Sequence, residues 1–207
     1  MVFKMKTALV LGATGHVGSY LVPRLAAMCY NVVAVSRGER SPYTAEDPVW
    51  GSVRRVSLRR DDHAGLAALI AEVRPDVICD LICYDLPDAK AMVDAIHALP
   101  GYDPYLVQIG SIWVYGVKFF VPVTEGHPRI GLYEYGVNKA AIEDYLLGLT
   151  AEGSLRATVL HPGHISGRGW LPINPQGNLN RKIYEDIRDG RPILLPDAGA
   201  ATVEIIA

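Results

Sequence analysis

A tyrosine and a lysine four residues apart, Tyr135 and Lys139, form a pair that suits acid–base chemistry. On a helix this spacing is about one turn, so both side chains project from the same face. A phenol with a pKa of about 10 is a poor proton donor and acceptor at neutral pH. A lysine one turn away favours the phenolate and lowers that pKa. Because Y-x-x-x-K is a common pattern, an ordinary surface pair on a helix is the alternative interpretation.

A serine follows a buried apolar segment upstream of this pair. Ser111 lies in YLVQIGSIWVYG, directly after a predicted strand. In a parallel sheet the carboxyl end of a strand opens onto the ligand crevice. Ser111 could therefore hydrogen-bond a substrate oxygen and hold it beside Tyr135. The alternative is a serine that makes a turn at a strand end.

Three glycines spaced three residues apart, Gly12, Gly15 and Gly18, separate a short apolar run from an amphipathic segment. In a strand–loop–helix unit, the first glycine permits a tight turn and the second lets the backbone approach a pyrophosphate. The third lets helix and strand pack closely, while the helix N-terminus supplies N–H groups and partial positive charge. A structural turn rich in glycine is the alternative.

The second predicted strand ends in VAVSRGER, which lacks the acidic residue that usually accepts the ribose 2′-hydroxyl of NAD. Ser36 and Arg37 occupy that place, with Arg40 nearby. A hydroxyl and a guanidinium suit a 2′-phosphate, so NADP fits better than NAD, which stays the alternative cofactor. The other interpretation is a solvated basic turn.

Predicted strands and helices alternate along the chain and would position these residues. The strands are continuous apolar runs, typical of a parallel sheet covered on both faces. The expected fold is therefore α/β, a Rossmann-type doubly wound parallel sheet with right-handed crossovers. We expect strands at Lys6–Leu11, Asn31–Ser36, Val53–Leu58, Asp76–Cys83, Tyr105–Gly110 and Leu155–His161, and helices at His16–Met28, His63–Val73, Leu86–Leu99 and Gly136–Leu149.

Two further features concern local structure. Pro23 lies inside the first predicted helix, where it removes a backbone hydrogen bond and is expected to cause a kink. After the sixth strand, HPGHISGRGWLPINPQGN predicts a long irregular loop, followed by a short helix at Leu179–Asp189 and a strand at Ala201–Ile206.

Composition excludes several classes of protein. The 207 residues are half apolar and one-fifth charged, with a net charge of −2, so no basic excess points to nucleic acid. No apolar stretch approaches the roughly 18 residues that a membrane span needs. Cys29, Cys79 and Cys83 form no metal-ligand pattern or disulfide framework, which favours a reducing cytoplasm. His161 and His164 have no third ligand at a telling spacing, so no metal site is expected.

Together, G-A-T-G-x-x-G, S-x-x-x-Y-G and Y-x-x-x-K resemble the short-chain dehydrogenase/reductase superfamily, most closely its extended branch, the NAD(P)-dependent epimerase/dehydratase family. The resemblance covers nearly the whole chain. It implies that Ser111, Tyr135 and Lys139 form the catalytic set. The expected cofactor contacts are Gly12, Thr14, Gly15, His16, Val17, Gly18, Ser36, Arg37, Asp61, Tyr135, Lys139, Pro162 and Gly163.

Within that set, the resemblance implies that Asp61 contacts the adenine and that Pro162 and Gly163 lie beside the nicotinamide amide. It implies hydride transfer at a carbinol or ketone of a sugar nucleotide or small carbonyl substrate, by an oxidoreductase, epimerase or dehydratase, and it suggests a homodimer. The third strand departs from the family, because Leu58 stands where an acidic residue is common. Cys83 and Tyr84 stand where small residues are commoner, which would narrow the pocket.

The largest departure is length, since members of the extended branch carry more chain after the sixth strand. We therefore expect a dinucleotide-binding domain over residues 1–165 and a partial substrate-binding lobe over 166–207, as in a chain truncated at its C-terminus. The alternative function is a non-catalytic NAD(P)-binding sensor or partner subunit, which the short C-terminus favours and the intact Ser–Tyr–Lys set opposes.

Overall fold

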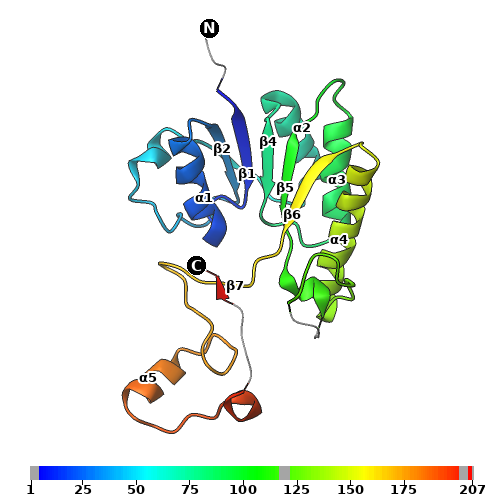
Figure 1. Ribbon diagram of the computed structural model, residues 1–207. Coiled ribbons are helices and arrows are strands. Elements are labelled where there is room, and N and C mark those ends of the chain that lie inside the picture. The colour runs from blue at the N-terminus through cyan, green and yellow to red at the C-terminus, as the bar shows by residue number, and fades with distance from the viewer. Residues whose placement is uncertain (1–4, 117–121, 201–204, 207) are drawn as a thin grey trace. The chain divides into compact units, whose positions relative to one another are not determined.

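The computed structural model describes residues 5–116, 122–200 and 205–206 and divides into two compact units, residues 1–161 and 162–207. The first unit contains a six-stranded parallel sheet in the order β3-β2-β1-β4-β5-β6 (Figure 1). This confirms the predicted α/β, Rossmann-type class. The strands are β1 (Thr7–Leu11), β2 (Asn31–Ser36), β3 (Arg54–Ser57), β4 (Val77–Asp80), β5 (Tyr105–Ile109) and β6 (Arg156–Leu160).

The strand order changes direction between β1 and β4, and in sheets of this kind ligands bind at the carboxyl ends of the strands at such a point. Leu11, the last residue of β1, pairs with Val35 of β2 on one side and with Asp80 of β4 on the other. The loops that follow these strands therefore meet at one edge of the sheet. Each predicted site residue of the first unit lies at the end of one of these strands, on a loop at this edge of the sheet or on the first two turns of α1 (His16–Ala27) or α4 (Tyr133–Ala151).

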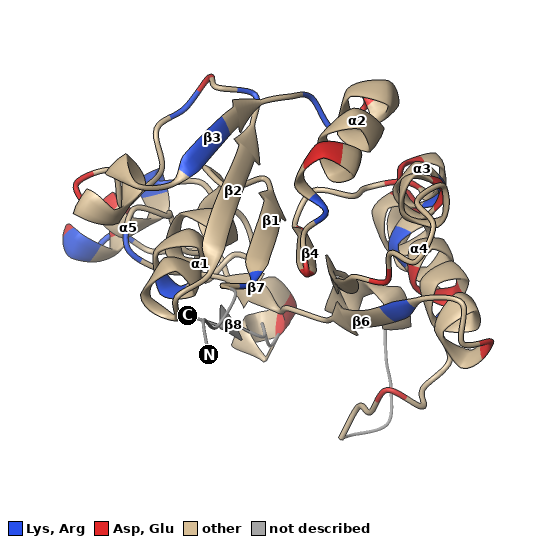
Figure 2. Ribbon diagram, turned by 90° about the horizontal axis from the view of Figure 1, so that it is seen from above, with Lys and Arg blue, Asp and Glu red and all other residues tan. Residues whose placement is uncertain are grey.

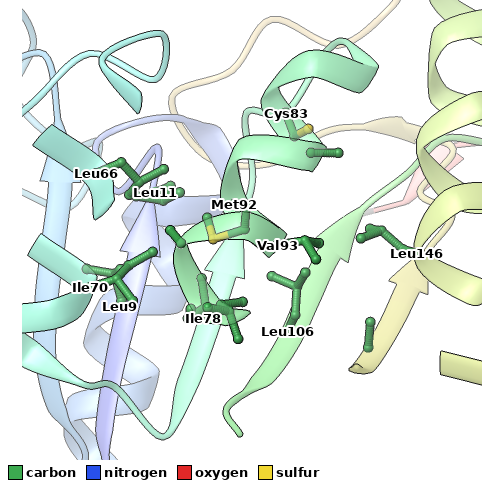
Figure 3. Close-up of a cluster of buried hydrophobic side chains, with 14 of the residues drawn as sticks. Leu9, Leu11, Leu66, Ile70, Ile78, Cys83, Met92, Val93, Leu106 and Leu146 are labelled. Atoms are coloured by element: carbon green, nitrogen blue, oxygen red, sulfur yellow. The ribbon is translucent and has the colours of Figure 1, made fainter. Parts of the chain in front are cut away.

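Both faces of the sheet are buried, which explains why its strands are continuous apolar runs. Leu9 and Leu11 point to one face, where they join residues of three helices, α2 (His63–Val73), α3 (Leu86–His97) and α4 (Tyr133–Ala151). Figure 3 shows this cluster, with Ile78 and Leu106 from the sheet packed toward Met92 and Leu146 from the helices. The other face is covered by α1 (His16–Ala27) and the short 3-10 turn η1 (Pro48–Gly51).

The first helix runs through Pro23 without a break. A proline at this position cannot donate to the carbonyl of Ser19, four residues earlier. In the structure the hydroxyl of Thr44 donates to that carbonyl over 2.7 Å and accepts from the indole N–H of Trp50. A side chain from a distant loop thus satisfies the group that the proline leaves without its helical donor.

Two predicted boundaries near the site are wrong. The fourth strand ends at Asp80 and not at Cys83, because the Asp80 carboxylate accepts from the backbone N–H of Ile82 and turns the chain out of the sheet. The fourth helix begins at Tyr133 and not at Gly136, since the N–H of Gly136 already donates to the carbonyl of Leu132. Tyr135 therefore lies within the first helical turn.

The second unit contains β7 (His164–Ile165), α5 (Lys182–Arg188), the 3-10 turn η3 (Pro196–Gly199) and β8 (Ile205–Ile206), with β7 and β8 paired in parallel. The helix predicted at Leu179–Asp189 is shorter at both ends. Its start is delayed because the side chain of Asn180 accepts from the N–H of Lys182. Of the strand predicted at Ala201–Ile206, residues 201–204 lie outside the described residues.

Across the described chain, every helix is too short or too polar to cross a membrane.

Candidate functional site

The turn after β1 needs a glycine at Gly12. Its φ is +82°, and a Cβ there would lie 2.6 Å from Cγ2 of Ile82, on the loop after β4. The N–H groups of Gly12 and Ala13 both donate to the carbonyl of Val35 over 3.0 Å. The turn is therefore fixed to β2 on one side and packed against the loop after β4 on the other.

The other two glycines have different surroundings. A Cβ on Gly18 would lie 2.4 Å from the carbonyl oxygen of Gly12 and 2.6 Å from Cα of Ala13, so helix and turn touch through this position. A Cβ on Gly15 would meet only the Gly12 oxygen, at 3.1 Å, among the described atoms within 4 Å. Gly15 is also the N-cap of α1, which lacks a side-chain cap within the described chain. This helix N-terminus is open to a phosphate.

These two surroundings predict opposite consequences for alanine substitution. Gly18→Ala should lower the free energy of unfolding by about 2 kcal/mol or more, because backbone atoms must move to admit the methyl group. Gly15→Ala, at φ −77°, should leave stability within about 1 kcal/mol but weaken binding of NADPH by steric obstruction. Urea unfolding and a fluorescence titration with NADPH measure the two effects. Equal losses of stability in both variants would contradict this assignment.

Thr14, His16 and Val17 surround this turn. His16 is buried, which lowers the pKa of its imidazole, and its ring lies 5.7 Å from that of Tyr43, centroid to centroid. Thr14 and Val17 are half-buried at the turn and the first helical residues. They stand at the same helix N-terminus as Gly15, so the predicted phosphate-binding residues of the loop are together.

The loop after β2 carries an ion pair that the sequence pattern does not reveal. Arg37 lies 3.1 Å from the carboxylate of Glu39, and both side chains are more than half exposed. The hydroxyl of Ser36 accepts from the N–H of Gly38 over 3.3 Å, so its own proton stays available to a ligand. Figure 2 shows acidic and basic residues next to one another on the loops after β2 and β3.

Asp61 lies on the loop after β3, where it forms a two-pronged ion pair with Arg59 at 2.7 and 2.9 Å. This arginine lowers the pKa of the Asp61 carboxyl. The neighbouring Asp62 is the N-cap of α2 and accepts from the N–H of Gly65. Asp62 is therefore the aspartate that caps α2, whereas Asp61 pairs with Arg59.

Arg60, which lies between Arg59 and Asp61 in the sequence, reaches into the protein and anchors the loop after β3 to the end of β4. Its guanidinium donates to the carboxylate of Asp80 over 3.0 Å and to the backbone carbonyl of Asp88 over 2.8 Å. Both side chains of the Arg60–Asp80 pair are almost fully buried. Because Asp80 also accepts from Ile82, the loop that follows β4 is held by a charged pair at its start.

The ammonium group of Lys139 is the best-defined part of the site. Lys139 is 2 % exposed, and its Nζ donates to the carbonyls of Cys83 and Ile109, each over 2.7 Å. These carbonyls belong to the loop after β4 and to the last residue of β5. Burial lowers the pKa of Lys139. The predicted lysine thus lies between the loop after β4 and the end of β5 rather than on the surface.

Tyr135 lies one turn before it, with the Lys139 Nζ 5.8 Å from the centroid of its ring. The ring centroid of Tyr84 lies 5.1 Å from the same Nζ and 6.5 Å from the ring centroid of Tyr135, so the two tyrosine rings are neighbours beside the ammonium. The indole of Trp113 meets the Tyr135 ring edge-on at 6.0 Å. Tyr135 is 40 % exposed, so this phenol is available to a ligand and has aromatic walls.

Ser111 is buried two residues after the end of β5 and is the N-cap of a short 3-10 turn, η2 (Ile112–Tyr115). Its hydroxyl oxygen accepts from the N–H of Trp113 over 3.2 Å, which leaves its own proton for another acceptor. The turn packs on α4, since a Cβ on Gly136 would lie 2.5 Å from the Trp113 carbonyl oxygen. The structure therefore brings Ser111, Tyr135 and Lys139 to the same edge of the sheet.

The sequence interpretation missed one polar group next to this set. Glu143 is buried and binds His161, which in turn binds the hydroxyl of Tyr115. One signal was present, because Tyr135, Lys139 and Glu143 are each four residues apart and share a helical face.

Pro162 and Gly163 belong to the second unit, directly before β7. Among the described residues, we find no group of three or more histidine, cysteine or acidic side chains arranged for a metal ion.

The sheet order, the open helix N-terminus after a glycine turn and an exposed tyrosine next to a buried lysine are the features of a Rossmann-type dinucleotide-binding protein. The profile of the NAD dependent epimerase/dehydratase family matches residues 8–206, and the chain belongs to this family. The predicted family is thereby confirmed.

Two curated relatives carry enzyme names. The 2'-dehydrokanamycin reductase of Streptomyces kanamyceticus is 31% identical over 199 residues, which cover 93% of this chain and 52% of the relative. The dTDP-6-deoxy-L-talose 4-dehydrogenase (NAD(P)(+)) of Kitasatospora kifunensis is 27% identical over 176 residues, which cover 77% of this chain and 52% of the relative. The chain thus spans about half the length of the curated relatives it matches.

Solved structures share the fold. UDP-glucose 4-epimerase from Thermotoga maritima, in a structure with UDP-glucose, aligns with a TM-score of 0.70 at 19% identity and covers 90% of this chain and 64% of that one. The UDP-glucose 4-epimerase from Thermus thermophilus, in complex with NAD, gives the same TM-score at 20% identity and the same coverage. At these identities the match concerns the fold.

Proposed function

We propose that this chain provides the cofactor-binding and catalytic part of an NADP(H)-dependent enzyme that transfers a hydride at a carbinol or ketone of a sugar substrate. The observation that carries the proposal is the buried Lys139, which donates to the carbonyls of Cys83 and Ile109 and has its Nζ 5.8 Å from the centroid of the Tyr135 ring. Among the described residues no carboxylate forms an ion pair with the Lys139 ammonium, so its burial needs a reason, and activation of a neighbouring phenol supplies one.

The residues fit a dinucleotide. A Cβ on Gly15 would meet only the Gly12 oxygen among the described atoms within 4 Å, and the first turn of α1 has no acidic residue to repel a diphosphate. On this proposal the dinucleotide extends from there past the loop after β4, which carries Ile82 and Tyr84, toward Tyr135. When bound, the nicotinamide supplies or accepts the hydride, and the protein residues manage the proton.

Each member of the catalytic set has a distinct part in that proton transfer. In the direction of reduction, the Tyr135 hydroxyl gives its proton to the substrate oxygen while the carbonyl carbon gains the hydride. The positive charge of Lys139 stabilises the resulting phenolate. Two of the three Lys139 protons are occupied by carbonyls, which leaves one for the cofactor ribose. Ser111 donates its hydroxyl proton to the same substrate oxygen and orients it.

Preference for NADP is proposed from the loop after β2. The Arg37–Glu39 pair is exposed, and such pairs contribute only about 0–1 kcal/mol, so a phosphate can replace the carboxylate at little cost. Arg37 and the free proton of Ser36 then face the 2′-phosphate. On this proposal Asp61 and Arg59 border the adenine, while Pro162 and Gly163 lie beside the nicotinamide amide.

A sugar ketone is the proposed substrate class. Both curated relatives are named for redox reactions, one of them at a carbon of a nucleotide-linked sugar. The aromatic walls formed by Tyr84 and Trp113 suit the apolar face of a sugar ring.

We further propose a cytoplasmic enzyme that acts as a homodimer on a small-molecule substrate.

Parallel fluorescence titrations with NADPH and NADH test the cofactor. NADPH should bind at least about tenfold more tightly, and Arg37→Ala should abolish most of that difference. Arg54→Ala, which breaks the exposed Arg54–Glu72 pair on β3, is the matched control and should change neither affinity. Equal affinity for the two cofactors would overturn the 2′-phosphate assignment.

Turnover is tested with a panel of nucleotide-sugar and aminoglycoside ketones, followed by NADPH absorbance. Consumption of NADPH with any of them supports the proposed reaction. Binding of NADPH without turnover over the whole panel would favour the non-catalytic sensor or partner subunit instead.

A further inference from the structure

Three side chains that the proposed reaction does not use form a continuous hydrogen-bonded network next to the site, in which Glu143 is buried and His161 and Tyr115 are partly buried. The carboxylate of Glu143 lies 2.6 Å from Nε2 of His161, and Nδ1 of His161 lies 3.0 Å from the hydroxyl of Tyr115. The Tyr115 and His161 rings meet edge-on, with centroids 5.2 Å apart. Because Glu143 and His161 are 4 % and 14 % exposed, water competes little for these bonds.

The network connects three separate elements. Tyr115 is the last residue of η2, His161 directly follows β6, and Glu143 lies two turns after Tyr135 on α4. Arg129, from the segment before α4, approaches Glu143 at 3.6 Å and binds the neighbouring Asp144 at 2.6 Å. A carboxylate, an imidazole and a phenol thus join a turn, a strand end and a helix.

His161 also touches the start of the same turn. A Cβ on Gly110 would lie 2.9 Å from Cδ2 of His161 and 2.7 Å from Cγ1 of Val159, so this imidazole lies directly against the backbone that leads into Ser111. The N–H of Gly110 donates to the carbonyl of Leu160, which is the residue before His161. His161 is therefore close to the backbone at the beginning of the turn and is bonded to the side chain at its end.

Helix α4 binds this region at two successive places along one face. Lys139 donates to the carbonyl of Ile109, and Glu143, one turn later, binds His161. Since Tyr135 precedes Lys139 by one turn and Glu143 by two on that face, the position of the phenol is tied to the turn that carries Ser111. Burial and the Glu143 charge both raise the pKa of Tyr115, which keeps its hydroxyl protonated as the partner of His161.

We propose that Glu143, His161 and Tyr115 are positioning residues that clamp η2 between α4 and β6 and so hold Ser111 at the site. The inference rests on the proposed function only for the role of Ser111 in the reaction. A buried carboxylate is costly, and an apolar side chain of similar size would serve a core position as well or better. The directional bonds of Glu143 through His161 to Tyr115 instead specify one arrangement of the turn.

The test follows Trp113, which lies in the middle of η2 against Tyr135 and reports on the turn without any substrate. The full chain is labelled with 5-fluorotryptophan, and its fluorine resonances are assigned by single tryptophan-to-phenylalanine variants. Glu143→Gln and Tyr115→Phe should each shift or broaden the Trp113 resonance and leave those of Trp50 and Trp170 in place. Asp144→Asn is the matched control and should shift none, because Asp144 binds the same arginine from the exposed side of α4.

Kinetics then separate positioning from folding. With a ketone that the wild-type protein reduces, Tyr115→Phe should lower kcat by about 10- to 100-fold, while the Kd for NADPH stays within about twofold. An unchanged Trp113 resonance in Tyr115→Phe would overturn the proposal that this network holds η2 in position. That variant loses only one hydroxyl, so it decides the matter even if Glu143→Gln fails to fold. Absence of turnover in the wild-type protein would count against the proposed function, whereas the fluorine spectra would still decide the clamp.

Discussion

Tyr135→Phe should reduce turnover of a ketone substrate by at least about 100-fold and leave the affinity for NADPH within about twofold. The substitution removes only the hydroxyl that exchanges a proton with the substrate. The phenylalanine ring can keep the contacts with Trp113 and Tyr84, which are 6.0 and 6.5 Å away between centroids. Initial rates of NADPH oxidation and the fluorescence titration measure the two quantities on the same preparation.

Tyr133→Phe is the matched control. Tyr133 lies two residues earlier on α4, is 73 % exposed, and packs on the same Trp113 ring at 5.9 Å. Its variant should keep wild-type turnover. If Tyr135→Phe also turned over at the wild-type rate, another group would have to supply the proton, and Tyr135 would be a wall of the crevice only.

The strands of this fold were predictable because burial on both faces of the sheet imposes continuous apolar runs. Their ends were not, since single side-chain bonds to the backbone decide them. Asp80 turns the chain at Ile82, and Asn180 delays the start of α5 by binding the N–H of Lys182. Periodicity has no information about such local bonds.

The glycine turn and the Ser–Tyr–Lys set could be located from motifs whose residues are close in sequence. The partners of those residues could not. Lys139 binds carbonyls 56 and 30 residues away, and His161 binds Tyr115 across 46 residues. A backbone carbonyl has no residue type to recognise, so its part in the site depends on the folded sheet. The Arg37–Glu39 pair was missed for a different reason, because pairing between neighbouring exposed charges is not fixed by their spacing.

Lys139→Met should affect both stability and reaction. The carbonyls of Cys83 and Ile109 would lose their donor, and each buried acceptor left unsatisfied costs about 1–3 kcal/mol. Relief from burying the ammonium offsets part of this cost, so we expect the free energy of unfolding to fall by about 2 kcal/mol. Turnover should fall by at least about 100-fold, since the phenolate of Tyr135 loses its nearby positive charge.

Urea unfolding and NADPH oxidation measure these effects. Lys182→Met is the control, because Lys182 is mostly exposed and only pairs with Asp186 one turn away. Its variant should keep stability within about 0.5 kcal/mol. Wild-type turnover in Lys139→Met would contradict the role assigned to the lysine, whatever the change in stability.

The pH dependence of the same variant separates the charge of Lys139 from its packing. Burial lowers the pKa of Lys139 in the folded state below its value in the unfolded chain. Between these two pKa values the unfolded state binds more protons, so the contribution of Lys139 to stability rises as the pH rises through this window. Lys139→Met has no proton to release. The free-energy difference between wild type and variant should therefore increase toward alkaline pH, and a constant difference would mean that the buried amine is not desolvated.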